Sequence, residues 1–214
     1  MSIYFLLLLM MILLLYEGIT SSMVYAPKKI KIISGMALIL MTFRYIALII
    51  LFVIDNQNYL YLLKPIVFTN LICIPVCGIV SIFIFARNSK IKLNKVLFIS
   101  VILCIIYSII IYISPASLNL SKFGGYNLDL KLEAYYYIPL LIASSMIMVK
   151  GIEMLNKTFS NKIGALLIIM SSIITLMSVL LTSINPNFMW LLFGDICWVI
   201  TLDYGLIKFK KARF

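Results

Sequence analysis

The chain has 214 residues, of which 64% are hydrophobic and 12% are charged, and its formal net charge is +11. Soluble domains are about half apolar and a quarter charged, so this composition argues against a soluble globular protein and indicates an integral membrane protein. The positive charge is spread over several short loops. That distribution is typical of cytoplasmic loops and not of a basic domain that binds nucleic acid.

Apolar runs predict seven transmembrane helices. Each needs roughly 20 apolar residues to cross the bilayer, so the whole chain, 1–214, is interpreted as one all-α polytopic membrane bundle. The first run has no basic segment before it and is interpreted as a retained helix, not a cleaved signal. The expected spans are residues 3–26, 35–54, 65–86, 96–113, 135–149, 163–184 and 188–207.

Two further features mark this arrangement of spans. Pro65 falls in the first turn of the third span, where a proline is tolerated, whereas Pro75 lies deep in the same span and is expected to kink it. The long polar connection between the fourth and fifth spans covers residues 116–134, with Gly124-Gly125 at its centre.

The basic residues divide the connections into two sets. The outer set holds only Lys64, Lys122 and Lys131, whereas the inner set, given below, holds most of the basic residues. The positive-inside rule therefore predicts an N-terminus outside and a C-terminus in the cytoplasm of a bacterial plasma membrane. Six helices would break the alternation of basic-poor and basic-rich connections. The inner set holds Lys28, Lys29, Lys31, Arg87, Lys90, Lys92, Lys95, Lys150, Lys157, Lys162, Lys208, Lys210, Lys211 and Arg213.

Charged side chains inside the spans are the strongest candidates for a functional site, because each costs about 2.5–3.5 kcal/mol at a helix centre. Arg44 in the second span and Asp195 in the seventh lie at depths that differ by about one helical turn, so an ion pair is possible. Three interpretations remain: a pair that fixes the helix arrangement, a pair that lines a polar cavity and is broken by a ligand or a conformational change, or no contact.

Other polar groups extend this candidate intramembrane site. Asn70 in the third span is expected to form an interhelical hydrogen bond or, less simply, to contact a ligand. Asp203 and Glu17 are expected to meet the basic cytoplasmic loops.

Aromatic residues gather at the expected outer ends of the spans. Tyr135, Tyr136, Tyr137 and Trp190 are predicted either to form an aromatic belt at the membrane interface or to face a ligand at the outer surface.

The residues that enzymes of the membrane use are missing from this sequence. It has no histidine and no GxSxG element. Asp195 and Asp203 lie on one helix about 12 Å apart by rise, too far to share a proton. Cys73 and Cys77 lack further ligands for a metal. We therefore expect no enzymatic activity, no metal and no cofactor.

Several short motifs resemble one family over nearly the whole chain. With seven helices and an outer N-terminus, they are similar to the N-terminal seven-helix sensor region of bacterial histidine kinases, which also has its longest outer connection between helices four and five. The motifs are Leu63-Lys64-Pro65, Ile74-Pro75, Phe83 and Phe85 before the basic loop, Gly124-Gly125-Tyr126 and Tyr135-Tyr136-Tyr137.

The resemblance implies a sensor but supplies no catalytic residues. In that family the seventh helix leads into a cytoplasmic kinase or cyclase module, whereas this sequence contains no phosphoacceptor histidine and no ATP-binding segment. It therefore implies a detached sensor or partner subunit that signals through another protein.

The sequence predicts a non-enzymatic sensor-like or regulatory membrane protein that binds a small or lipid-like ligand. Its expected partners are the lipid bilayer and a membrane or cytoplasmic protein, with no nucleic acid. The alternative is a small transporter, or the membrane subunit of an export system for a hydrophobic substrate. A third possibility is an immunity or assembly protein that packs against another membrane protein.

Overall fold

The computed structural model describes residues 3–54, 57–86, 93–120, 125–131, 133–158, 160–184 and 190–212. Seven long helices form one bundle: α1 (Ile3–Tyr25), α2 (Lys28–Val53), α5 (Asn70–Ala86), α6 (Leu93–Ile113), α7 (Glu133–Leu155), α8 (Lys162–Ile184) and α9 (Leu191–Ala212). Shorter elements are α3 (Gln57–Leu60), η1 (Tyr61–Leu63), α4 (Lys64–Val67), β1 (Ala116–Leu120) and β2 (Tyr126–Leu130). Arg87, Lys90, Lys92, Lys122, Gly124 and Arg213 lie outside the described residues.

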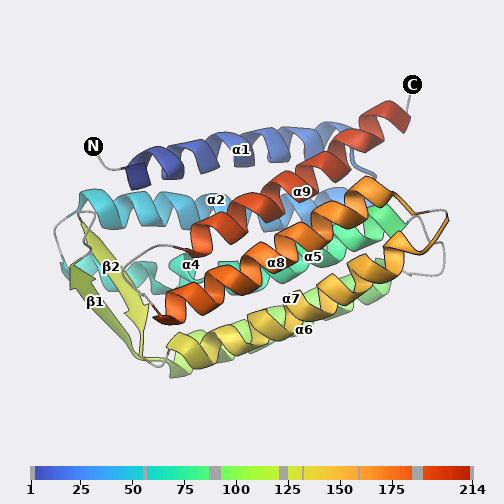
Figure 1. Ribbon diagram of the computed structural model, residues 1–214. Helices are drawn as coiled ribbons and strands as arrows, with labels where there is room; N and C mark the ends of the chain where they lie inside the picture. The colour runs from blue at the N-terminus through green and yellow to red at the C-terminus, as the bar shows by residue number, and fades with distance from the viewer. Residues whose placement is uncertain are drawn as a thin grey trace.

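Successive long helices run in opposite directions. The N-terminus and the β1–β2 hairpin therefore lie at one end of the bundle and the C-terminus lies at the other (Figure 1). Lys28 at the start of α2 and Lys162 at the start of α8 are at the C-terminal end, whereas Lys64 and Lys131 are at the hairpin end. Within the described residues, these lysines of the predicted inner and outer sets therefore lie at opposite ends of the bundle.

Among the described residues, five helical segments are long and apolar enough to cross a membrane. They are Ile3–Tyr25, Lys28–Val53, Tyr61–Ala86, Tyr136–Leu155 and Lys162–Ile184. Within the described side chains, α6 contributes a shorter apolar helix, Leu97–Ile113, and α9 carries the two aspartates predicted within the last span.

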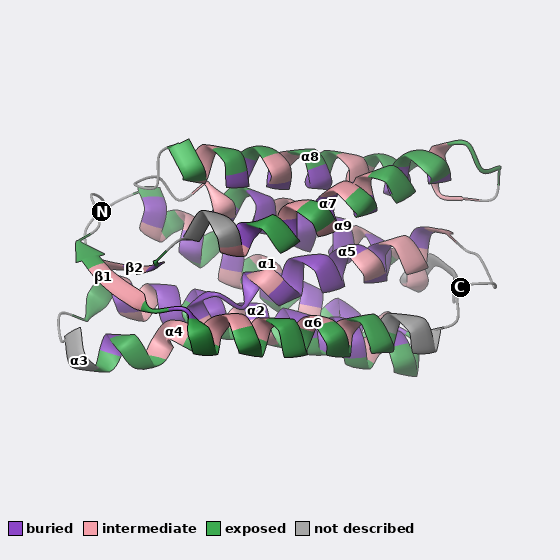
Figure 2. Ribbon diagram, turned by 90° about the horizontal axis from the view of Figure 1, so that it is seen from below, coloured by how far each residue is buried: buried purple, intermediate pink, exposed green. Residues whose placement is uncertain are grey.

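Helix α5 is at the centre of the bundle. In the most apolar part of the span Tyr61–Ala86, which ends with α5, 72% of the residues are buried, against 28–44% in the other four described spans. Helix α5 contacts α2, α6, α7, α8 and α9, and its burial contrasts with the exposed surface of α6 (Figure 2).

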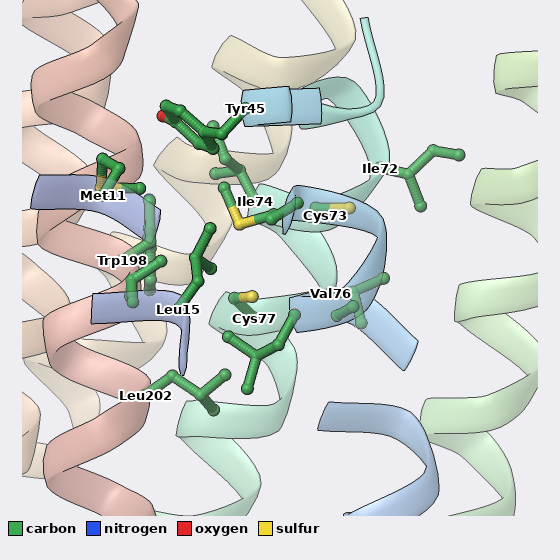
Figure 3. Close-up of a cluster of buried hydrophobic side chains, with 14 of the residues drawn as sticks. Met11, Leu15, Tyr45, Ile72, Cys73, Ile74, Val76, Cys77, Trp198 and Leu202 are labelled. Atoms are coloured by element: carbon green, nitrogen blue, oxygen red, sulfur yellow. The ribbon is translucent and has the colours of Figure 1, made fainter. Parts of the chain in front are cut away.

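The core around α5 is made of side chains from four helices. Trp198 and Leu202 of α9 point toward Leu15 of α1 and Cys77 of α5, and Tyr45 of α2 lies at the edge of the same cluster (Figure 3). Trp198, Leu202, Leu15 and Cys77 have no exposed surface. This packing connects helices that are far apart in the sequence.

Two prolines lie inside neighbouring helices. Pro75 is within α5 and Pro139 within α7, and each removes one backbone donor from its helix. Both line the same small cavity of about 20 Å³ beside Tyr107 of α6. The expected kink at Pro75 stays a prediction.

The connection predicted only as polar contains an antiparallel hairpin. Ala116 pairs with Leu130 and Leu120 with Tyr126. Leu128 and Leu130 on β2 are buried and Asn127 and Asp129 alternate with them, so one face of the strand packs on the ends of the helices. The hairpin therefore covers that end of the bundle.

Candidate functional site

The site begins at a break in the third predicted span, between α4 and α5. Leu71 N donates to the carbonyl of Phe68, three residues back, at 3.1 Å. In a continuous α-helix it would donate to Val67 O. The Val67 carbonyl instead accepts a hydrogen bond from Arg44 Nε at 2.8 Å. The break thus gives a buried guanidinium a backbone partner inside the bundle.

Arg44 forms an ion pair with Asp195, as its depth predicted. Arg44 Nη1 donates to Asp195 Oδ2 and, at 3.3 Å, to Tyr45 Oη, while Tyr45 Oη donates to the same Oδ2 at 2.7 Å. Arg44 is 6% exposed and Asp195 and Tyr45 have no exposed surface. Buried charges are tolerated when they are paired and hydrogen-bonded, and this arrangement fastens α2 to α9.

A small pocket opens above the ion pair, under the hairpin. Its volume is about 70 Å³. Arg44 lines it, and the hydrogen bonds of its guanidinium to Val67 O, Tyr45 and Asp195 use Nε and Nη1, not Nη2. The remaining lining residues are Tyr45, Leu48, Val67, Phe68, Asn127, Leu128, Asp129, Tyr137, Thr182, Trp190, Leu191 and Leu192.

The predicted aromatic residues divide between this pocket and other surroundings. Tyr137 is buried and lines the pocket together with Trp190. Tyr136 is half-buried and lines the small proline cavity instead. The side chain of Tyr135 lies outside the described residues. Two of the four predicted outer-face residues therefore converge on Arg44.

Asn70 is buried at the first position of α5, 1% exposed. The interhelical hydrogen bond expected of it does not form within the described chain, because neither its amide nitrogen nor its amide oxygen has a partner there. It does not line the pocket beside Arg44. The structure thus keeps Asn70 in the core but apart from the pocket.

Asp203 differs from its expectation. Instead of meeting the basic loops, it is 7% exposed and packs on Gly18 of α1. A Cβ on Gly18 would lie 2.5 Å from Asp203 Oδ1, so the absence of a side chain there lets the carboxylate fit. The position of Asp203 along α9 does not reveal this contact, because the approach of α1 to α9 depends on Gly18, which is far from α9 in the sequence.

Some pocket residues were not predicted. Tyr45 and the Val67 carbonyl are invisible to a search for charges. Asn127 and Asp129 come from the hairpin. The sequence contains a pattern that could have predicted this hairpin: leucines alternate with polar residues on both sides of Gly124-Gly125, which is typical of two strands joined by a turn.

Hydroxyl groups join α9 to α8 along the neighbouring interface. Trp198 Nε1 donates to Thr175 Oγ1 at 2.8 Å, and the hydroxyls of Ser171 and Thr201 lie 2.6 Å apart. Hydrogen bonds between membrane helices are worth about 0.6–2 kcal/mol each. The helix that holds Asp195 therefore has polar contacts on two sides, to α2 and to α8.

Two larger apolar grooves flank α6. One, of about 440 Å³, lies between α6, α2 and α5 and is lined by residues such as Met36, Val76 and Cys104. The other, of about 520 Å³, lies between α6, α5 and α7. At the hairpin end α6 is tied to α4, because Tyr107 Oη donates to Pro65 O and Lys64 Nζ donates to Ser114 O.

No residues in the described part of the chain form a group of three or more metal-ligating side chains. No protein-family model, curated protein or solved structure matches this chain.

Proposed function

We propose that this protein is a sensor-like or regulatory subunit of a bacterial plasma membrane, with seven spans, an outer N-terminus and a cytoplasmic C-terminus. A small or lipid-like ligand would enter the pocket under the hairpin from the outer side. Helix α9 would carry the signal to a partner protein at the cytoplasmic end. The observation that carries the proposal is that Arg44, which lines the pocket, is ion-paired to Asp195 on the last helix.

The pocket's size and chemistry define the part of the ligand that it would hold. At about 70 Å³ it is well below the roughly 300–1,000 Å³ of sites for drug-sized ligands. It therefore suits one small polar group, such as the carboxylate of an amphiphile. Arg44 Nη2 would donate to that group, because guanidinium–carboxylate hydrogen bonds are among the strongest in proteins.

Such a ligand would act by competition for Arg44. A second carboxylate beside the guanidinium shares its charge and weakens its attraction to Asp195. The tie between α2 and α9 then loosens while the hydroxyl contacts of α9 with α8 remain. The resemblance to the sensor region of histidine kinases supports the same direction of signalling, from the outer end to the end of the last helix.

The test uses decanoate as the probe and decanol as its neutral analogue, with the full chain in nanodiscs. The two tryptophans report separately: Trp190 lines the pocket and Trp198 lies in the core of α9. In a Trp198→Phe variant, decanoate should shift Trp190 fluorescence and decanol should not. In a Trp190→Phe variant, decanoate should change Trp198 fluorescence, which reports movement of α9.

A matched pair of variants controls for nonspecific partitioning. Thr182→Phe fills the pocket and should abolish the decanoate response, whereas Ser183→Phe, at an exposed neighbour that does not line the pocket, should keep it. Equal responses to decanoate and decanol, or a response that survives Thr182→Phe, would contradict a ligand site at Arg44.

A second candidate function is favoured by the apolar grooves beside α6. Their volumes, about 440 and 520 Å³, suit a hydrophobic substrate of an export system. Liposomes that contain the full chain and a fluorescent phosphatidylglycerol distinguish the two: a transporter exposes inner-leaflet label to an external quencher, and a sensor leaves it protected.

A further inference from the structure

One face of α1 is left uncovered by the rest of the bundle. Helix α1 lies at its edge and packs on α2 and α9 (Figure 1). The uncovered residues recur at intervals of three and four, the spacing of a seam that packs against another helix. They are Ile3, Leu6, Met10, Leu13, Glu17, Thr20 and Val24, and Leu9, Tyr16 and Met23 beside them are also exposed.

Glu17 is the charged member of this face, and a second carboxylate lies directly behind it. Asp203 of α9 is 93% buried, since its exposed fraction is 7%, and its Oδ1 has no hydrogen-bond partner in the described chain. That oxygen is directed at Gly18, the residue next to Glu17. Neither carboxylate forms an ion pair with a described residue.

The position of Glu17 makes this arrangement costly. It lies about 12 Å from the end of α1, at a rise of 1.5 Å per residue, in a helix long and apolar enough to span a membrane. Charged groups in spans are normally paired or face a polar cavity, as Asp195 is with Arg44. A cation from outside the described chain would provide the missing partner.

From the uncovered seam and the two carboxylates we infer that the Glu17 face of α1 docks a transmembrane helix of a different protein, one that carries a lysine or arginine at the depth of Glu17. A second copy does not fit. Copies inserted in the same direction and related by a twofold axis would bring Glu17 against Glu17. Lys28, Lys29, Lys31, Lys64, Lys150 and Lys162 lie near the ends of the described spans. Arg44, which lies deep within its span, is buried and already paired.

The docking face is independent of the ligand pocket. It requires α1 to cross the membrane, but it involves none of the residues that line the pocket beside Arg44. A failure of the decanoate experiment therefore leaves this inference standing, and the reverse also holds.

The experiment measures energy transfer in liposomes between the donor-labelled full chain and an acceptor-labelled synthetic probe. The probe is a single-span Leu/Ala helix with one lysine at the depth of Glu17, and its control has leucine there. The lysine probe should bind about tenfold more tightly, the size expected for one interhelical polar contact. Glu17→Gln should abolish the difference, while Tyr16→Leu, at an exposed neighbour, should preserve it.

A charge reversal separates pairing from a general loss of polarity. Glu17→Lys should bind a glutamate-bearing probe better than the leucine probe. Because Glu17 is exposed, these variants should fold like the natural chain. The inference is overturned if lysine and leucine probes bind the natural chain equally, or if Glu17→Gln keeps the preference. Transfer between two labelled copies of the chain that depends on Glu17 would also overturn it, in favour of self-association.

Discussion

Asp195 contacts its partners through one oxygen. Oδ2 accepts from both Arg44 and Tyr45, whereas Oδ1 is buried without a partner among the described residues. The guanidinium contacts its partners through Nε and Nη1. The pair is therefore held firmly enough to fix α2 against α9, while Asp195 keeps one carboxylate oxygen without a partner among the described residues.

Removing one member of this pair should be costly. Asp195→Ala leaves a buried guanidinium without its counter-charge, and the expected loss of stability is about 3–5 kcal/mol. The double change Arg44→Leu with Asp195→Leu should cost less than the sum of the single changes. Unfolding of the purified protein in mixed micelles measures both. Glu153→Ala, which breaks the exposed Lys150–Glu153 pair, is the control and should cause no measurable change. Equal costs for Asp195→Ala and Glu153→Ala would contradict a structural role for the buried pair.

Two glycines on neighbouring helices provide a test of packing at the α1–α9 contact. In Gly18→Ala the new methyl group would lie 2.5 Å from Asp203 Oδ1, so overpacking should destabilise the protein by about 1–3 kcal/mol. In Gly35→Ala the nearest atom, Ser22 Oγ, is 3.9 Å away, and alanine should be neutral or stabilising because of its helix propensity. Thermal unfolding in detergent compares the two, and a neutral Gly18→Ala would show that α1 and α9 can separate without cost.

The sequence identified Arg44 and Asp195 as a possible ion pair, because charges are rare in apolar spans and their depths can be counted along helices, but it left open whether they make contact, which the structure shows they do. It could not predict the Val67 carbonyl as a partner. That contact arises from a backbone break between α4 and α5, and the side chains around the break are apolar. Asn70 was expected to form an interhelical hydrogen bond, but it is buried at the first position of α5 without a partner among the described residues. The partner of such a group depends on packing that a single helix does not reveal.

At the scale of elements, the hairpin depends on a close approach at its turn. Gly125 has φ +72°, and a Cβ there would lie 2.6 Å from Phe52 Cα at the end of α2. The atoms nearest to that Cβ belong to the backbone of α2, which cannot move aside as a flexible side chain could. The fit of the hairpin over the pocket is therefore set by this glycine.

Gly125→Ala should displace the hairpin from the end of α2. A left-handed conformation costs a non-glycine residue about 1–2 kcal/mol, and the contact with Phe52 adds to that cost. With Trp198→Phe as background, acrylamide should quench Trp190 more strongly than in the parent protein. Leu120→Ala, at a position 79% exposed on the same hairpin, is the control and should leave quenching unchanged. Unchanged quenching in Gly125→Ala would mean that the hairpin does not cover the pocket.

Helix boundaries were the less accurate part of the sequence prediction. Helix α2 begins at Lys28, although its apolar run was predicted from residue 35, and α7 continues to Leu155 beyond the predicted 149. The prediction followed hydrophobicity, which reports contact with lipid or core. Backbone hydrogen bonding continues past the apolar region, and lysines at the helix ends can extend toward the interface.

For the whole molecule, the proposed orientation gives a direct test. Single cysteines are placed in a cysteine-free chain at two exposed positions at opposite ends, Asn119 on β1 and Lys157 after α7. In intact cells a membrane-impermeant maleimide should label Asn119→Cys at once. It should label Lys157→Cys only after the membrane is permeabilised, because basic loops are retained in the cytoplasm. The reverse pattern would invert the proposed topology, and labelling of both positions would contradict the membrane arrangement.

The long sequence separation of the ion pair has a consequence for how the protein is made. Arg44 and Asp195 are 151 residues apart, so α2 would leave the ribosome and enter the bilayer long before α9 exists. Until synthesis finishes, the guanidinium has no counter-charge and the Val67 carbonyl can be its first partner. A prematurely terminated chain would keep a cation without its counter-charge in the membrane, which is energetically costly. Only a chain that has been translated as far as α9 can form the ion pair, so the pairing of Arg44 would distinguish it from an incomplete chain.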